Sequence, residues 1–416
     1  MSDLHDLCRF PSRPIGKIYL ENLKYYLKNG IPATYTIEEA YKFNNNIEEE
    51  PTTTTTPLHL LCTNVPDDLN GDEIKIVNEM VDVLFEYGAG WCLTDIDEKT
   101  PGCILVSRGM KNLVIYQKIV EAGVRAELLL RKVEELNVEF IEPQEETGEG
   151  MKAVDNSINI SNESADEGQG SPTTDPACNQ EAYLNTKLEY KDNALVTKDG
   201  QDGVMMSWES TLMELGCNSL FESVNSQDKD EEVNILNIGF GMGIIDTMIN
   251  SRDPTKQYIC EAHPDVLKKL RSDGWYEKPN VVILEGRWQD QLDFLLSEGT
   301  TFFDGIYYDT FSEHYEDMLQ LFDYIVGLLK PNGVFTFFNG LGADREVVYD
   351  VYRNLVEMDL ANYGLKCSFQ SIEVAPKALQ ANTSTDDQSQ SIWDDVKRPY
   401  WSCPVYYHPV ARFIDI

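Results

Sequence analysis

Apolar runs and helical periodicities alternate along the C-terminal half of the chain. Short runs rich in Val, Ile, Phe and Tyr predict strands at 233–238, 257–262, 281–284, 303–308 and 334–338. Apolar residues at helical spacing between these runs predict helices at 244–249, 265–271, 288–296 and 315–329. Strands that alternate with helices in this way are typical of an α/β fold with a doubly wound parallel sheet. A turn is predicted at 330–333, and the aromatic tail 399–407 is expected to close the sheet as an antiparallel hairpin.

The first third of the chain has a helical pattern with a degenerate repeat. The sequence T-P-L-H at 56–59 matches the turn that opens an ankyrin unit, and T-P at 100–101 repeats it weakly. Apolar stretches that end on Gly88 and Gly123 predict that the second helix of each unit ends there. We therefore expect an all-α ankyrin-like repeat domain over residues 1–140, with an unrelated helical domain as the alternative. The histidine of the first motif is interpreted as a structural hydrogen-bonding residue.

Between these two patterns the chain becomes polar and acidic. Carboxylates recur among Gly, Ser, Asn and Pro residues at Glu142, Glu145, Glu146, Glu149, Asp166 and Glu167. Such a segment cannot bury enough apolar surface to fold, so residues 141–180 are expected to form a flexible linker. The chain then divides into residues 1–140, this linker and a second domain over residues 181–416. Polar residues at 380–391 predict a loop insertion in that second domain.

Charge and composition restrict the class of protein. The 71 acidic residues outnumber the 34 basic ones, which gives a formal net charge of −37. Such a field repels phosphate backbones and attracts cationic proteins, so we expect a basic protein partner and no direct nucleic-acid binding. No apolar run approaches the ~20 residues that cross a bilayer, so no membrane association is expected. Nine cysteines without a C-x-x-C pair indicate reduced thiols and no zinc site, as expected in the cytoplasm and nucleus.

A glycine-rich turn follows the first predicted strand of the C-terminal domain. The segment Gly239-Phe240-Gly241-Met242-Gly243-Ile244 leads from a strand to a helix, and the next strand ends near Glu261. A dinucleotide fingerprint requires its third glycine where Ile244 stands, so nicotinamide binding is disfavoured. S-adenosylmethionine needs the same close approach of the backbone and an acid for its ribose hydroxyls, a role that Glu261 can fill. A glycine turn that only packs the helix against the strand is the alternative.

Further unusual residues follow other predicted strands, at the edge where ligands bind in open α/β sheets. Gly286-Arg287-Trp288 follows the third strand and Asp309 follows the fourth, while Glu209 lies in a segment with two methionines and a tryptophan before the first strand. Asp309 is either a carboxylate at the mouth of the cleft or the N-cap of a helix. Glu209 is either part of the same cleft or an ordinary acid in the first turn of a helix. The pattern alone leaves both alternatives open.

Taken together, these motifs resemble a known enzyme family. Residues 183–410 resemble guanidinoacetate methyltransferase in the motifs at 205–209, 238–242, 286–288, 303–310 and 329–333. With the ankyrin-like N-terminus and the acidic linker, the resemblance extends to the type IV protein arginine methyltransferases, which modify the δ (N5) nitrogen of arginine. It implies a class I S-adenosylmethionine-dependent methyltransferase fold, Rossmann-like and doubly wound. The cofactor-binding residues that it implies are Tyr190, Met206, Gly239, Phe240, Gly241, Met242, Gly243, Ile244, Glu261, Ala262, His263, Arg287, Trp288 and Asp309.

One departure from the family pattern concerns the residues after the ribose acid. Ala262-His263 stands where the guanidinoacetate enzymes have Cys-Asn, so His263 either contacts the adenosine or only satisfies the start of a helix. The same resemblance makes Glu209 and Asp309 the catalytic pair that grips the guanidino group. Two carboxylates can pair with the planar guanidinium fork and fix which nitrogen faces the sulfonium methyl. Asp309 is the expected proton acceptor, and the already activated sulfonium makes a metal unnecessary.

The resemblance also implies a substrate. A basic protein, in this family a large-subunit ribosomal protein, would suit the net negative charge of the chain. Two other functions remain open from the sequence. One is a small-molecule guanidino methyltransferase of the guanidinoacetate type, and the other is a non-catalytic ankyrin adaptor that keeps the fold alone.

Overall fold

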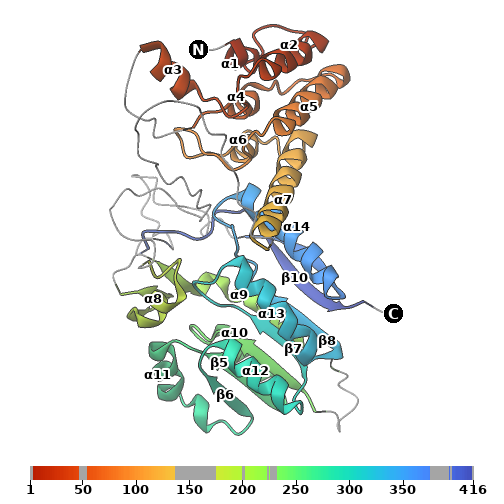
Figure 1. The fold of residues 1–416 in the computed structure, drawn as a ribbon. Coiled ribbons are helices and arrows are strands. Elements are labelled where there is room, and N and C mark those ends of the chain that lie inside the picture. The colour runs from red at the N-terminus through yellow and green to blue at the C-terminus, as the bar shows by residue number, and fades with distance from the viewer. Residues whose placement is uncertain are drawn as a thin grey trace, which may run out of the picture.

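The structure is a computed structural model, which describes residues 3–45, 54–135, 175–198, 202–222, 224, 232–374, 393 and 396–414. An all-helical part lies at the top of Figure 1 and a sheet domain lies below it, and the two meet along helices α7 and α14. The predicted linker falls outside the described residues up to residue 174, and the predicted loop insertion at 380–391 also falls outside them.

The N-terminal part consists of helices, as predicted. They are α1 Asp3–Leu7, α2 Lys17–Lys28, α3 Ile37–Asn45, α4 Pro57–Asn64, α5 Gly71–Glu86, α6 Pro101–Ser107 and α7 Val114–Glu135. Thr56 and Thr100 cap α4 and α6 with their side-chain oxygens. His59 Nδ1 accepts from the Thr56 amide at 3.1 Å, and Nε2 donates to the Leu93 carbonyl at 2.8 Å. The structural interpretation of this histidine is confirmed, while the assignment of the helices to ankyrin repeats stays a prediction.

The two predicted helix ends have different outcomes. Helix α5 ends before Gly88, which has a φ of +83° and so occupies the left-handed position that stops a helix. Helix α7 instead continues through Gly123, so the predicted end there is wrong. A Cβ on Gly123 would lie 2.6 Å from Val351 Cγ2 of another helix. This glycine is therefore required by close packing and not by a turn.

The larger sheet has seven strands in the order β6-β5-β4-β7-β8-β10-β9. They are β4 Asn234–Ile238, β5 Lys256–Glu261, β6 Val281–Glu285, β7 Phe303–Tyr308, β8 Leu329–Phe337, β9 Leu365–Glu373 and β10 Val405–Phe413. Strands β4 to β8 pair in parallel, and β10 is antiparallel to both neighbours. The flanking helices are α10 Ile244–Ser251, α11 Pro264–Ser272, α12 Trp288–Glu298, α13 Tyr315–Leu328 and α14 Glu346–Asn362. The predicted doubly wound α/β sheet is confirmed.

Two details of the sheet differ from the prediction. The predicted turn at 330–333 is wrong, because these residues belong to β8, where Phe303 pairs with Leu329 but Gly305 pairs with Val334. Lys330 holds this irregular stretch through a 2.8 Å bond to Asp304 of β7. The antiparallel end of the chain is confirmed, but β10 lies inside the sheet and β9 forms its edge. Pairing with β8 on one side gives β10 a partner that an edge hairpin would lack.

A small second sheet precedes the large one and was not predicted. It contains β1 Leu188–Lys191, β2 Ala194–Thr197 and β3 Gly203–Met206, all antiparallel. Helix α8 Gln180–Asn185 lies before it, and the short helix η2 Ser207–Glu209 and α9 Ser210–Leu220 follow it. The last two residues of β3, Met205 and Met206, point to different neighbours because side chains alternate along a strand.

Helices α7 and α14 join the two parts of the molecule. Arg131 of α7 bonds Asp359 of α14 at 2.8 Å, and Tyr116 bonds Asp350 at 2.8 Å. Apolar residues of both helices, including Val351, belong to one continuous hydrophobic core. The two domains that the sequence separates therefore share a packed interface.

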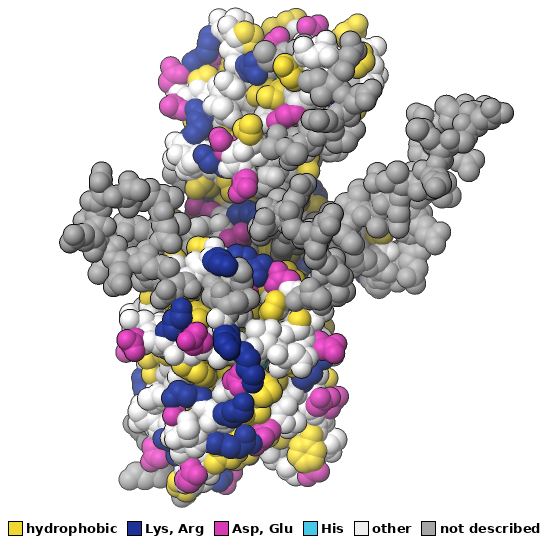
Figure 2. All heavy atoms as spheres, turned by 90° about the vertical axis from the view of Figure 1, so that its left-hand side faces the viewer, with side chains coloured by type: hydrophobic (Ala, Val, Ile, Leu, Met, Phe, Trp, Pro, Cys, Tyr) yellow, Lys and Arg dark blue, Asp and Glu magenta, His cyan; other side chains and the backbone are white. Residues whose placement is uncertain are grey.

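Charges of both signs are interspersed on the surface of the sheet domain. Figure 2 shows Lys and Arg side chains gathered over the lower half of the molecule, on the side where α11 lies in Figure 1. Lys268, Lys269 and Arg271 of this helix each pair with a nearby carboxylate. This face therefore carries basic residues paired with acids, although the whole chain has a net charge of −37. None of the described helices is long and apolar enough to cross a membrane.

Candidate active site

The glycine-rich loop lies at the carboxyl end of β4. Gly239, Gly241 and Gly243 have φ angles of +94°, +53° and +73°, which glycine adopts without the cost that a Cβ imposes. A Cβ on Gly239 would lie 1.9 Å from the backbone oxygen of Asp309. The loop and the residue after β7 can therefore approach each other only because position 239 has no side chain.

Glu261 ends β5 beside this loop and is 9% exposed. Its carboxylate accepts from the backbone amides of Phe240 at 2.9 Å, Ala262 at 2.8 Å and His263 at 2.7 Å. Burial raises the pKa of Glu261, and these amide bonds oppose the rise. A carboxylate has room for about four hydrogen bonds, so beside these three Glu261 can accept about one more, from a ribose hydroxyl.

A cavity, here called the loop cavity, opens beside Glu261. Most of the residues predicted to bind the cofactor line it, namely Gly239, Gly241, Glu261, Ala262, His263, Arg287, Trp288 and Asp309. Tyr190 closes on the loop, since its hydroxyl donates to the Gly241 carbonyl at 3.0 Å. Phe240 is buried against Trp275, and Ile244 begins α10. The Met242 amide donates to the Met205 sulfur at 3.2 Å.

Among the predicted cofactor residues, Met206 lies outside the loop cavity, and His263 lines it but is already bonded to the protein. Met206 does not line the loop cavity but packs in a core cluster with Leu212 and Trp401, and Met205 lines the cavity in its place. His263 caps α11, because Nδ1 accepts from the Asp265 amide at 3.1 Å. Its Nε2 lies 3.2 Å from the Tyr183 carbonyl and donates to it. Both ring nitrogens are therefore bonded to the protein, as expected of a residue that satisfies a helix start.

The two predicted catalytic acids meet at a second cavity. Glu209, in the short helix after β3, is 2% exposed, and Asp309, directly after β7, is half-buried. Burial raises the pKa of both carboxyl groups, and the Asp309 charge raises that of Glu209 further. Asp309 Oδ2 has no hydrogen-bond partner among the described residues. Two such acids without a lysine or arginine beside them among the described residues lower the stability of the fold, and they can bind a cationic ligand.

Tyr400 is a member of the site that sequence reasoning missed. Its hydroxyl donates to Glu209 Oε1, which also accepts from the Met206 amide at 2.9 Å. The ring packs edge-on against Trp393 and over Gly203, where a Cβ would lie 3.1 Å from it. The aromatic tail was predicted to be a strand, and nothing in its pattern linked it to an acid 191 residues away.

Glu313 and Ser312 were also missed. Glu313 Oε1 accepts from Trp288 Nε1 at 2.7 Å and its other oxygen accepts from Thr310 at 2.5 Å, so it fixes the segment after Asp309. Ser312 is 9% exposed and has a φ of +65°, a strained conformation for a residue with a side chain. Its hydroxyl has no partner among the described residues and lines the second cavity. Strain and an unpaired buried hydroxyl are features that no sequence pattern reveals.

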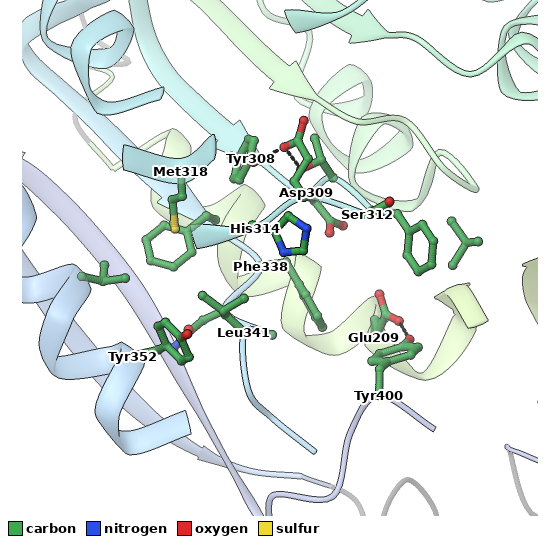
Figure 3. Close-up of a pocket in the computed structure, with 18 of the residues that line it drawn as sticks. Glu209, Tyr308, Asp309, Ser312, His314, Met318, Phe338, Leu341, Tyr352 and Tyr400 are labelled. Carbon is green, nitrogen blue, oxygen red and sulfur yellow. Dashed lines mark hydrogen bonds between the residues drawn. The ribbon is translucent and has the colours of Figure 1, made fainter. Parts of the chain in front are cut away.

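The second cavity, here called the two-acid cavity, has a volume of about 210 Å³. Figure 3 shows Glu209 and Tyr400 at one end, with Asp309 and His314 nearer its middle. Asp309 and Glu313 line this cavity and the loop cavity alike. Among the residues that line the two-acid cavity there is no lysine or arginine. The site therefore joins a glycine-loop pocket to a pocket that favours cations.

The fold is that of a class I methyltransferase. It has the strand order of this class, an antiparallel β10, and a glycine loop followed by an acid at the end of the next strand. The family model for guanidinoacetate N-methyltransferase matches residues 177–388. Protein arginine N-methyltransferase 2 of Debaryomyces hansenii is 63% identical over the whole of both chains. The protein of the same name from Saccharomyces cerevisiae is 49% identical over 99% of this chain and 100% of its own. The chain therefore belongs to the guanidinoacetate N-methyltransferase family and is an arginine methyltransferase.

Among solved structures, the chain is similar to the O-methyltransferase TomG from Streptomyces achromogenes in complex with SAM. The TM-score is 0.32 and the identity 17%, over 51% of this chain and 82% of that one. The cofactor of this chain is S-adenosylmethionine, as membership of the family requires. The residues present fit it, since Gly239 leaves the loop open and Glu261 keeps room to accept from a ribose hydroxyl.

Proposed function

We propose that the chain transfers the methyl group of S-adenosylmethionine to the δ (N5) nitrogen of arginine in a basic protein. The observation that carries the proposal is the position of Asp309, which lines the loop cavity on one side and shares the two-acid cavity with Glu209 on the other. A guanidinium held by these two acids would lie beside the cofactor. The cofactor supplies an electrophilic methyl group on a sulfonium.

The two acids orient the guanidinium and take up its charge and proton. Each carboxylate can form charge-assisted hydrogen bonds with the planar fork, and the opposite charge lowers the raised pKa values so that both acids ionise on binding. A guanidinium nitrogen is a weak nucleophile because its lone pair is delocalised. As the nitrogen–methyl bond forms and the sulfur–methyl bond breaks, the nitrogen loses its proton, and Asp309 is placed to accept it.

The choice of the δ nitrogen rests on the resemblance to type IV enzymes and on the number of acceptors. Two carboxylates can occupy the N–H groups of both terminal nitrogens. The δ nitrogen is then left to face the sulfonium, and the second oxygen of Asp309, which has no partner among the described residues, can accept its proton. The hydroxyl of Tyr400 restrains Glu209 and so helps to keep the fork in one orientation.

A protein substrate is favoured over guanidinoacetate by the charges of the two-acid cavity. Guanidinoacetate carries a carboxylate two bonds from its guanidino group, and such a group needs a cation or several donors when buried. The cavity lining contains Glu209, Asp309 and Glu313 but no lysine or arginine. An arginine side chain within a polypeptide brings no such negative charge.

The protein partner in this proposal is a large-subunit ribosomal protein. Ribosomal proteins are basic, and a net charge of −37 would attract them at low salt. The N-terminal helical domain, proposed to be an ankyrin-like repeat, would add a recognition surface. The proposal places this activity in the cytoplasm and nucleus.

The test is methyl transfer from labelled S-adenosylmethionine to a ribosomal protein extract. After complete hydrolysis, label is expected in δ-methylarginine and not in the ω-methylated forms. Guanidinoacetate serves as the competing acceptor, and Asp309→Asn serves as the matched control that keeps shape and removes the charge. Label in an ω-methylarginine would contradict the δ assignment, and turnover of guanidinoacetate alone would contradict a protein substrate.

A further inference from the structure

The two-acid cavity extends well beyond the two acids. Figure 3 shows Met318, Leu341 and Tyr352 gathered at the end away from Glu209 and Tyr400. We call this end the apolar arm and define it by its lining residues Met318, Phe337, Leu341, Tyr352 and Val356. Its lining comes from α13, the end of β8, the following loop and α14.

The chemistry of the arm differs from that of the acid end. Its lining side chains are apolar apart from the Tyr352 hydroxyl, and none carries a charge at neutral pH. A guanidinium placed there would lose its hydration without gaining an anion, which is costly. An apolar side chain would instead exchange water for apolar contacts, which is favourable in proportion to its buried area. The arm therefore selects an apolar occupant, while the acids select the arginine.

The far wall of the arm is held from behind. Val356 and Tyr352 lie on α14, and the same helix packs its Val351 against Gly123 of α7. The Tyr116 hydroxyl of α7 also bonds Asp350 at 2.8 Å. Because α14 is fixed between the sheet and the N-terminal domain, the arm is preformed. A preformed pocket binds a side chain at a lower entropic cost than one that must be ordered first.

We propose that the apolar arm binds a hydrophobic side chain of the substrate polypeptide, near in sequence to the target arginine. The inference rests on the proposed function, since only a polypeptide can place both side chains in one continuous cavity. It adds that the enzyme recognises a short motif of one arginine and one large apolar residue at a fixed spacing. Burial of one such side chain, compared with glycine, corresponds to a preference of ~10-fold or more.

The test is binding of arginine peptides to the full chain loaded with the demethylated cofactor, S-adenosylhomocysteine. Each peptide carries one arginine, and each position up to four residues on either side is in turn Leu or Gly. Leu at one position is expected to tighten binding by ~10-fold over Gly. In Val356→Phe, which fills the arm, this preference is expected to disappear. Leu341→Phe narrows the arm from a loop and gives a second reading if α14 does not tolerate the first change.

Val77→Ala is the matched control. Val77 lies on α5 of the N-terminal domain and is fully buried, but it belongs neither to α14 nor to the lining of the arm. This variant is expected to lose stability and keep the Leu preference. Equal binding of all peptides, or a preference that survives both Phe variants, overturns the inference. Failure of methyl transfer to arginine contradicts the proposed function instead, so that the two failures are distinguished.

Discussion

The hydrogen bond from Tyr400 to Glu209 gives the sharpest test of how the site works. Tyr400→Phe removes one hydroxyl and leaves the ring, which packs against Trp393 and over Gly203. Among the described residues, the Glu209 carboxylate would then retain only the Met206 amide as a donor. Burial and the Asp309 charge already raise the pKa of Glu209, and the Tyr400 bond opposes that rise. The variant is therefore expected to raise the pKa further.

The size of the effect follows from the strength of this bond. A hydrogen bond to a charged group contributes about 1.5–3 kcal/mol, and one pKa unit corresponds to about 1.36 kcal/mol. The pKa of Glu209 in Tyr400→Phe should thus rise by about one to two units. At a pH below that value, the protonated acid cannot pair with a guanidinium. We expect kcat/KM for an arginine substrate to fall by ~10- to 100-fold at neutral pH and to recover as the pH rises.

The assay is the pH profile of kcat/KM for methyl transfer by the wild type and the variant. Tyr324→Phe is the matched control, because Tyr324 also donates to a carboxylate, Asp293 at 3.0 Å, but on the exposed surface. Its profile should superimpose on that of the wild type. A Tyr400→Phe profile that drops equally at every pH would show that the hydroxyl acts only through packing. An unchanged profile would refute the role of Glu209 in binding the guanidinium.

Four further outcomes follow from the structure. The methyl-transfer activity of the wild type should rise with pH through the neutral range, as the two acids lose their protons. The free energy of unfolding of the ligand-free protein should fall over the same pH range, because the folded state keeps protons on both acids that the unfolded chain has released. Activity measured against pH and urea unfolding at each pH check these two outcomes. Ser312→Ala should lower kcat/KM by ~10-fold with unchanged cofactor affinity, and an unaltered rate would mean that the hydroxyl does not contact substrate. Gly239→Ala should abolish cofactor binding measured by calorimetry, whereas Gly364→Ala, at a φ of +77° with nothing within 4 Å, should cost only ~1 kcal/mol in stability. Arg131→Met should lower the unfolding free energy by ~2 kcal/mol in thermal melts, and the added change Asp359→Leu should restore part of it.

The strands and helices of the catalytic domain could be predicted because their signal is local. The run 303–308 is buried along its whole length, and its phenylalanine, isoleucine and tyrosines between turn residues predict a strand without reference to distant parts of the chain. The turn at 330–333 could not be predicted correctly, since Lys330 is held in β8 by Asp304 of another strand. The role of Gly123 could not be predicted either, because the sequence does not distinguish a glycine that ends a helix from one that lets two helices pack closely.

The candidate site divides in the same way. The glycine loop, Glu261 and the two acids follow β-strands or lie in a recognisable motif, so spacing and family resemblance locate them. Tyr400 becomes part of the site only when the tail folds back on β3. Ser312 is identified by its backbone angle and its unpaired hydroxyl, which are properties of the folded chain alone.

The interface between α7 and α14 makes the N-terminal domain part of the catalytic unit. Asp350 and Asp359 are 3% and 8% exposed, and α7 contributes one partner to each, Tyr116 and Arg131. Without α7, each carboxylate would lose that partner, and the apolar side chains that pack against α7 would be exposed. Since Tyr352 and Val356 of the same helix line the two-acid cavity, a loosened α14 would change the cavity itself. The sequence leaves open whether the two domains dock on each other, and the packing joins the helical domain to one wall of the substrate pocket.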